Sequence, residues 1–162
     1  MDTTKNKEIA QYKEDGFEGF VSISFLRTHK SMIPKVGGVY IVIRDSEKAP
    51  EFLEKGTGGS FRDKNPNVPI EKLTEKYISD SATMYIGKAT NLKDRIDQLL
   101  RFGAGKKVGH WGGRYLWQLA DAEDLIVAWK PTPDCDPRQI ENRMIEDFIS
   151  IHGEKPFANL IK

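Results

Sequence analysis

The sequence has a single cysteine, Cys135, among its 162 residues, and this scarcity excludes several classes of site. One thiol can form neither an internal disulfide nor a thiolate zinc cluster, and it fits a reducing compartment. No apolar run approaches the length of a membrane span, and the polar start, MDTTKNKEIAQYKEDG, lacks the apolar segment of a signal peptide. We therefore expect a cytoplasmic protein with no membrane partner, in which Cys135 is an ordinary loop residue.

The chain also lacks a strong excess of either charge. Its 25 Lys and Arg residues against 24 Asp and Glu give a net charge of +1, which neither favours nor excludes a nucleic-acid partner. The distribution is uneven, because the segment 88–114 has two acids, Asp94 and Asp97, and seven basic residues. Such a cluster can attract phosphate locally, and a solvated basic face is the alternative. The basic residues are Lys88, Lys93, Arg95, Arg101, Lys106, Lys107 and Arg114.

The pattern of apolar residues predicts three strands with helices largely between them. GGVYIVIR (37–44), TMYIG (83–87) and DLIVAW (124–129) have the composition of strands. The helix after TMYIG has Thr90 or Asn91 as its N-cap, and the last helix begins after Asp136 and ends at Gly153. Length and this element order predict one domain of the α/β class, a small α+β sandwich.

The single domain, 1–162, has two segments outside this pattern. Residues 1–35 form an N-terminal extension, and we expect its first dozen residues to be frayed. Residues 45–80 form an insertion between the first two strands, with a short helix within 68–78. A loop of this length is usually functional or carries its own small structure. Its GTGGS stretch lacks the Lys-Ser/Thr ending of a phosphate loop, so we interpret it as flexible.

One acid lies where the last helix should be apolar. On a helical wheel, Glu141 falls within the stripe that contains Ile140, Met144 and Phe148. A carboxylate at such a position loses hydration unless it is protonated, paired or bound to a metal. Glu141 is therefore a candidate metal ligand, and a buried ion pair is the alternative.

Two tyrosines and an arginine would complete a site for phosphodiester chemistry. Tyr40 and Tyr85 lie on predicted strands, and Arg95 lies at the edge of the apolar stripe of its helix. A phenol can transfer a proton, an arginine matches two phosphate oxygens, and a carboxylate holds a hard cation. Because its ordinary pKa is about 10, tyrosine is a poor base unless nearby cations lower that pKa, and Lys88, Arg95 and a bound metal are the candidate cations. The structural alternatives are core tyrosines and a boundary arginine.

Two short motifs on the predicted strands resemble the signature of the GIY-YIG nuclease family. GVY, from Gly38 to Tyr40, is similar to the first signature strand, and YIG, from Tyr85 to Gly87, to the second. The continuation YIGKATNLKDRI adds specificity, since a lysine follows the glycine and Arg95 follows Tyr85 by ten residues. The segment therefore resembles the family over a full strand and helix.

The end of the chain continues this resemblance. ENRMI, beginning at Glu141, is similar to the start of the helix that carries the family's metal glutamate. KPFAN places Asn159 three residues after a proline, as the family's terminal asparagine is placed. The resemblance extends from about residue 37 to residue 159 and is interrupted by the insertion.

The resemblance implies a three-stranded antiparallel sheet flanked by helices and a DNA endonuclease that uses Mg²⁺ or Mn²⁺. Tyr40 and Tyr85 would flank the scissile phosphate, one of them as general base or proton relay. Arg95 would contact the phosphate, Glu141 would bind the metal, and Asn159 would brace the site. The supporting glycines of the two motifs are Gly38 and Gly87.

The chain departs from the family at the position one turn after the arginine, where Leu99 replaces a usual tyrosine or histidine. His110 is the candidate replacement, as a proton-transfer group or a phosphate contact, and a structural histidine is the alternative. Trp111 is a candidate for DNA contact, whereas we expect Trp117 in the core. The expected DNA-binding residues are Lys88, Lys93, Lys106, Lys107, Trp111 and Arg114.

Two other classes of function are compatible with this pattern. A non-catalytic nucleic-acid-binding module would retain the scaffold, and a plain interaction domain would have no affinity for DNA. The sequence contains no appended DNA-reading domain, so specificity would come from substrate structure, a homodimer or a protein partner.

Overall fold

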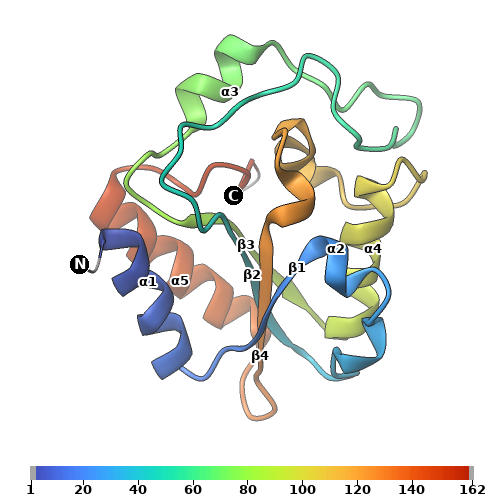
Figure 1. Cartoon of the computed structure of the whole chain (residues 1–162). Helices are drawn as coiled ribbons and strands as arrows, with labels where there is room; N and C mark the ends of the chain where they lie inside the picture. Colours follow the sequence, from blue (N-terminus) through green and yellow to red (C-terminus); the bar gives the residue numbers. More distant parts are fainter. Residues whose placement is uncertain (1–2, 161–162) are drawn as a thin grey trace.

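The computed structural model describes residues 3–160, and within them the chain forms five α-helices and one four-stranded antiparallel sheet of order β1-β4-β2-β3 (Figure 1). The strands are β1 (Glu18–Ser22), β2 (Gly38–Ile43), β3 (Thr83–Ala89) and β4 (Ile126–Pro131). The α-helices are α1 (Thr4–Glu14), α2 (Ile23–Leu26), α3 (Ile70–Lys76), α4 (Leu92–Gly103) and α5 (Pro137–His152). Short 3₁₀ helices are η1 (Lys30–Met32), η2 (Trp111–Gln118) and η3 (Ala122–Asp124).

The predicted α+β class is confirmed, but the sheet has four strands where three were expected. The fourth, β1, comes from the N-terminal extension and pairs with β4. No helix within residues 3–160 is long and apolar enough to cross a lipid bilayer.

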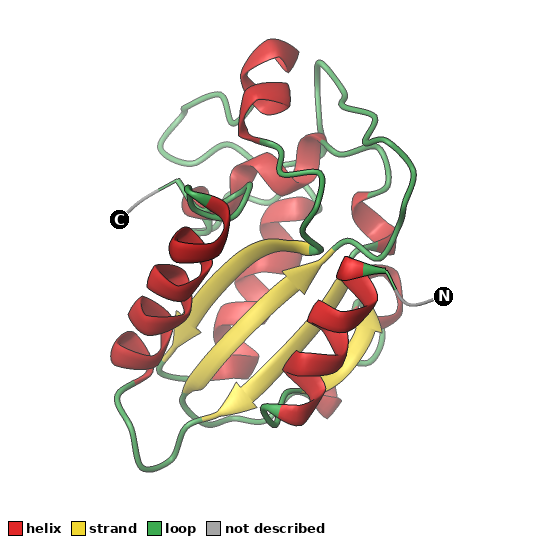
Figure 2. Ribbon diagram, turned by 90° about the vertical axis from the view of Figure 1, so that its left-hand side faces the viewer, coloured by secondary structure: helices red, strands yellow, loops and turns green. Residues whose placement is uncertain are grey.

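The helices cover the sheet on both faces. In Figure 2, α1 and α5 lie on the near face and α4 lies behind the strands. The alternation along the central strand β2 explains this arrangement. Val39 and Ile41 belong to the core beneath α1 and α5, while Tyr40 and Val42 belong to the larger core on the α4 side. The position of Tyr40 places the candidate chemistry on the α4 face.

The expectation that the first dozen residues are frayed is wrong for residues 4–12, which belong to α1, while residues 1–2 lie outside the described residues. Ile9 and Tyr12 pack on the core that α5 covers. The Glu8 carboxylate accepts hydrogen bonds from Ser81 Oγ at 2.8 Å and from the Ala82 amide at 2.7 Å. Hydrogen bonds supply much of the attachment of α1 to the sheet. The apolar stripe of this helix is weak, so its sequence pattern did not predict that α1 packs there.

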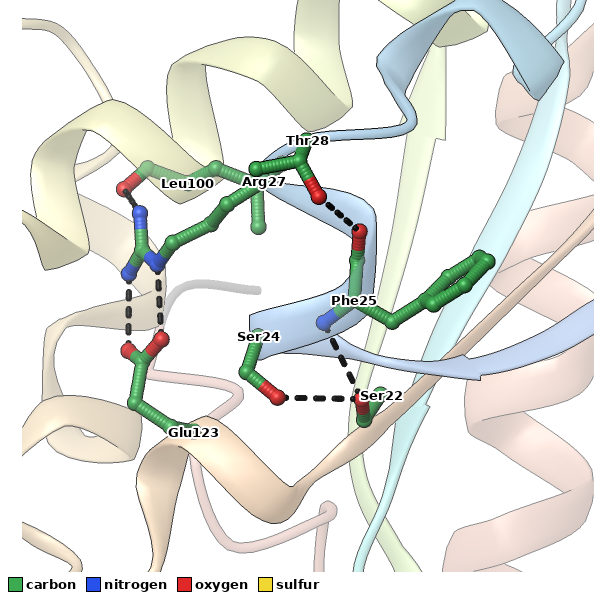
Figure 3. Close-up of polar contacts among 7 residues, drawn as sticks. All are labelled: Ser22, Ser24, Phe25, Arg27, Thr28, Leu100 and Glu123. Carbon is green, nitrogen blue, oxygen red and sulfur yellow. Dashed lines mark hydrogen bonds and ion pairs between the residues drawn. The ribbon is translucent and has the colours of Figure 1, made fainter.

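Helix α2 is attached to the remainder of the fold by Arg27 (Figure 3). The helix begins where Ser22 Oγ accepts a hydrogen bond from the Phe25 amide at 3.1 Å. Arg27 donates two bonds to the Glu123 carboxylate, at 2.7 and 2.8 Å, and a third to the Leu100 carbonyl at 2.7 Å. A bidentate arginine fixes geometry as well as charge, so α2 is tied both to α4 and to η3.

The insertion folds back onto η2 and contains α3 within the predicted segment. Gln118 Nε2 donates to the Leu53 and Val68 carbonyls, each at 2.9 Å. A Cβ added to Gly59 would overlap the carbonyl of Lys106. The glycines of GTGGS therefore allow close backbone packing, which the interpretation as a flexible stretch missed.

Candidate active site

The two signature motifs pair with each other across β2 and β3. Tyr40 lies directly opposite Gly87 in the antiparallel register. A Cβ on Gly87 would lie 2.6 Å from the Tyr40 hydroxyl oxygen, so only glycine leaves room for this ring. A Cβ on Gly38 would overlap the Lys130 carbonyl and lie 2.9 Å from Leu92 Cδ1. Close packing thus explains why both motif positions, 38 and 87, are occupied by glycine.

A cleft of about 560 Å³ opens where β3, α4 and the first turns of α5 meet. Its lining brings together four of the predicted residues, which are Tyr85, Lys88, Arg95 and Glu141. Asp94, Asp136 and Arg138 add further charges to the wall. Tyr40 and His110 do not line the cleft, because both side chains are fully buried behind it.

The Glu141 side chain is 14% exposed, and its Oε1 lies 3.6 Å from Lys88 Nζ. Burial raises the pKa of the Glu141 carboxyl, and the positive charges of Lys88, Arg138 and Arg95 counteract that effect. An ion pair is therefore present, but it is only partly buried, unlike the buried pair that was the alternative. Its lysine is 44% exposed, so the pair can open without burying a charge.

Arg95 connects the cleft with the loop that follows α4. Its Nη1 donates to the Gly109 carbonyl at 2.5 Å and to Gln98 Oε1 at 2.7 Å. Among the described residues these bonds engage Nη1 alone, so other N–H groups of the guanidinium remain for a ligand. Arg95 is thus held in place by bonds that do not consume its capacity to bind an anion.

Burial raises the pKa values of both tyrosines, and this effect outweighs the lowering by Arg95. Tyr85 lines the cleft, yet the residue is only 8% exposed. Arg95 lowers the pKa of Tyr85, but the loss of hydration outweighs its charge. The pKa of Tyr40 is raised still further, to well above its ordinary value. Both are neutral phenols near neutral pH in this structure.

His110 is part of the core and not of the surface. Its Nε2 lies 2.8 Å from the Tyr40 hydroxyl, and its ring centroid lies 5.5 Å from that of Tyr85. Burial, followed by the charge of Arg95, lowers the pKa of His110 to about 3, so the imidazole is neutral at pH 7. Among residues 3–160 its Nδ1 has no hydrogen-bond partner.

These positions correct two predictions. A phosphate contact by His110 is incompatible with a fully buried ring. Tyr40 does not flank a phosphate in this structure, because its fully buried ring lies against Gly87 of the neighbouring strand. The tilted contact between Tyr40 and Tyr85, with ring centroids 5.9 Å apart, instead makes Tyr40 and His110 the support of Tyr85.

Asn159 is bound to the edge strand of the site. Its Oδ1 accepts from the Ile86 amide at 2.9 Å, and its Nδ2 donates to the Ile86 carbonyl at 2.8 Å. A second contact with the same strand is the hydrogen bond that the Ala158 amide donates to the Met84 carbonyl at 2.8 Å. Because β3 is the last strand of the sheet, these bonds satisfy backbone groups that would otherwise be unpaired.

The predicted DNA-binding residues do not gather in one place. Lys88 lines the cleft, whereas Lys106 and Lys107 are exposed on the loop after α4. Trp111 is partly buried, and the Arg114 guanidinium lies 4.5 Å from its ring centroid. The remaining predicted DNA-binding residue is Lys93, which is partly buried and outside the cleft. Trp117, which was expected in the core, is buried there.

The residues of the cleft fit one kind of metal site. Within residues 3–160 no three His, Cys, Asp or Glu side chains are grouped so as to hold an ion by themselves. Mg²⁺ often takes only one or two protein carboxylates and completes its shell with waters and substrate phosphates. Glu141, a largely buried carboxylate beside a cleft, fits the role of such a single ligand.

Arg138 and Gln98 are cleft residues that were not predicted. Arg138 follows the N-cap of α5 and so resembled ordinary helix surface. Its spacing of three residues before Glu141, which puts it on the same side of the helix, was the available signal. Comparisons of this chain with known protein families, curated proteins and solved structures found no match.

Proposed function

We propose that this protein is a divalent-metal-dependent endonuclease that hydrolyses phosphodiester bonds of DNA. The observation that carries the proposal is the convergence of Tyr85, Arg95 and Glu141 on one cleft from three separate elements. The same residues lie in the motifs that resemble the GIY-YIG nuclease family. A cytoplasmic location and Mg²⁺ or Mn²⁺ as cofactor belong to this proposal.

The cations of the cleft would bind the scissile phosphate. Arg95 offers N–H groups that its bonds to the Gly109 carbonyl and Gln98 leave free. Lys88 is half exposed, so its ammonium can exchange the Glu141 carboxylate for a phosphate oxygen at small cost. This exchange would release Glu141 to bind the metal. Positive charge at these positions stabilises the negative charge that develops during hydrolysis.

Tyr85 would orient the attacking water or a phosphate oxygen. As a neutral phenol it donates one hydrogen bond and accepts another, so it can pass a proton along without itself becoming charged. A bound Mg²⁺ or Mn²⁺ would supply a water of lowered pKa and additional charge beside the phosphate. Tyr40 and His110, which are buried, would hold the Tyr85 ring at the cleft wall.

The test is metal-dependent cleavage. Purified protein would be incubated with supercoiled plasmid, branched duplexes and single strands in Mg²⁺ or Mn²⁺, together with Glu141→Ala and Arg95→Ala variants of matching circular dichroism. We expect the wild type to cut at least one substrate and each variant to lose about 10²-fold or more of the rate. A correctly folded wild type that leaves every substrate intact would refute the proposal.

A second candidate is a nucleic-acid-binding module without catalysis. The ion pair of Glu141 with Lys88 favours it, because the pair occupies the carboxylate that a catalytic metal would need. Such a module would bind DNA with a strong salt dependence and never nick it in any metal.

A further inference from the structure

The insertion carries a tight turn whose sequence does not favour its shape. The Lys64 amide donates to the Phe61 carbonyl at 3.1 Å, and the two central residues, Arg62 and Asp63, have φ of 54° and 60°. Positive φ at two successive residues is typical of a type I′ turn, which prefers glycine and asparagine. Aspartate also tolerates such a position, but arginine does not favour it, so contacts elsewhere must help to hold Arg62 in this turn.

Those contacts are with the end of α4 and the loop after it. The Gly59 amide donates to the Phe102 carbonyl at 2.8 Å. Phe61 packs on the large core, and its Cε2 would lie 3.8 Å from a Cβ on Gly109. The insertion therefore lies directly against the loop that carries Gly109, as the arch above α4 in Figure 1 illustrates.

This packing joins two sets of exposed cations that are more than forty residues apart in the sequence. Arg62 and Lys64 extend from the turn, and Lys106 and Lys107 extend from the loop. All four are exposed, and among the described residues none of the four forms an ion pair. The one acid within the turn is Asp63. We call these four cations the basic patch.

The basic patch is continuous with the cleft through a short series of contacts. Arg95 lines the cleft and donates to the Gly109 carbonyl. Gly109 lies beside Phe61, and the Arg62 guanidinium lies 5.1 Å from the Phe61 ring centroid. A polyanion bound across Arg95 would therefore meet Arg62 and its neighbours next.

We propose that the basic patch, made of Arg62, Lys64, Lys106 and Lys107, binds the backbone phosphates of DNA that flank the phosphate in the cleft. The proposal rests on the proposed function for the identity of the polymer. It gives the insertion a role, because the turn supplies half of the cations and its packing sets their position. Binding of this kind is electrostatic and independent of base sequence.

The experiment measures DNA affinity against salt for a charge-removing variant and a matched control. Arg62→Asn/Lys64→Gln removes two charges from the patch, and asparagine tolerates the positive φ at position 62. Lys7→Ala/Arg143→Ala removes two exposed charges from α1 and α5, on the opposite face of the sheet. The probe is a 20-base-pair duplex without metal, followed by fluorescence anisotropy, and cleavage is assayed separately with Mg²⁺.

We expect the slope of log affinity against log salt to fall by about 2 for the patch variant, with no change for the control. The affinity of the patch variant for the duplex at 0.1 M salt should fall by at least about tenfold. Arg62→Lys/Lys64→Arg, which keeps both positive charges, should retain the affinity of the wild type. Equal slopes for the patch variant, the control and the wild type would overturn the patch, even if the wild type cuts DNA. A reduced slope in a protein that never cuts would support the patch and refute the nuclease, whereas no DNA binding at all would refute both.

Discussion

The hydroxyl of Tyr40 lies 2.8 Å from Nε2 of His110, and neither side chain has any exposed surface. The two residues are seventy positions apart, and their bond joins the central strand to the loop after α4. Because both groups are polar and cut off from water, each depends on the other for its hydrogen bond. A neutral imidazole paired with a neutral phenol is compatible with this dry environment, whereas an imidazolium is not.

Tyr40→Phe should therefore destabilise the fold by about 1–3 kcal/mol, because it leaves His110 Nε2 buried and unpaired. His110→Leu should have a similar cost for the converse reason. The double variant should lose less than the sum of the two, by about 1 kcal/mol, since no polar group is left without its partner. Urea unfolding of the four proteins gives this coupling directly, and strictly additive losses would show that the bond contributes nothing.

The buried imidazole should also make stability depend on pH. The pKa of His110 is lowered from 6.5 to about 3, so the unfolded chain binds more protons than the folded chain between these values. The stabilising contribution is complete above pH 6.5 and is lost as pH falls. Between pH 7 and pH 5 the loss from this one residue is about 2 kcal/mol.

Comparison with His110→Gln isolates that loss, since the carboxylates titrate in both proteins. The free energy of unfolding should fall more steeply with acid in the wild type than in the variant. Parallel curves over pH 7–5 would mean that water reaches the ring in solution.

Much of the fold is predictable because some elements carry their own local signals. The Asp136 carboxylate accepts a hydrogen bond from the Arg138 amide at 3.0 Å, and Gly153 ends α5 with φ of 83°, as the capping pattern predicts. β1 gave no such signal, because a bulge with positive φ at Gly19 and Phe20 interrupts the alternation on which strand prediction depends. A strand of this kind is specified by its partner β4.

The candidate site likewise contains some residues whose positions local sequence patterns predict and others whose positions they do not. The position of Glu141 on its helix follows from local periodicity, and its place in the cleft agrees with that reading. The burial of His110 depends on a distant packing event, because its Nε2 lies 2.8 Å from the hydroxyl of Tyr40, seventy positions earlier in the chain. The direction of the tyrosine pKa shifts likewise depends on how much water the finished core excludes, which no local pattern contains.

Gly87→Ala should destabilise the fold, because Gly87 lies directly opposite Tyr40 in the sheet. Its Cβ would lie 2.6 Å from the Tyr40 hydroxyl oxygen, and the rigid ring beneath is fully enclosed. We expect a loss of about 1–3 kcal/mol in thermal or urea unfolding, as for other overpacked cores. Gly109→Ala is the control, because its Cβ would make only an ordinary contact at 3.8 Å. A loss no larger than that of the control would show that the strands separate easily at this point.

Asn159→Ala should loosen the edge of the sheet. It removes both bonds to Ile86 and leaves a buried amide and carbonyl without partners, which costs about 1–3 kcal/mol for each group. Hydrogen exchange of the Ile86 amide should accelerate more than that of the amides in α1. Asn142→Ala, at an exposed position of α5, should alter neither quantity. Unchanged protection of Ile86 would mean that another group closes this edge.

Glu141→Gln should separate activity from stability. The substitution keeps the shape of the side chain and removes the charge that the proposed metal ligand requires, so cleavage should fall by about 10²-fold or more. Stability should not fall with it. Burial raises the pKa of Glu141 in the folded state, so the carboxyl contributes stability below its unfolded pKa and loses that contribution as pH rises through the folded value.

At pH 8 the wild type therefore retains a charge that the fold disfavours, and Glu141→Gln should unfold at an equal or higher urea concentration. Glu146→Gln, at an exposed position on the same helix, is the matched control and should change neither activity nor stability. A variant that is much less stable at pH 8 would mean that the ion pair with Lys88 outweighs the burial of the carboxylate. Full cleavage by a stable Glu141→Gln protein would remove this residue from the catalytic site.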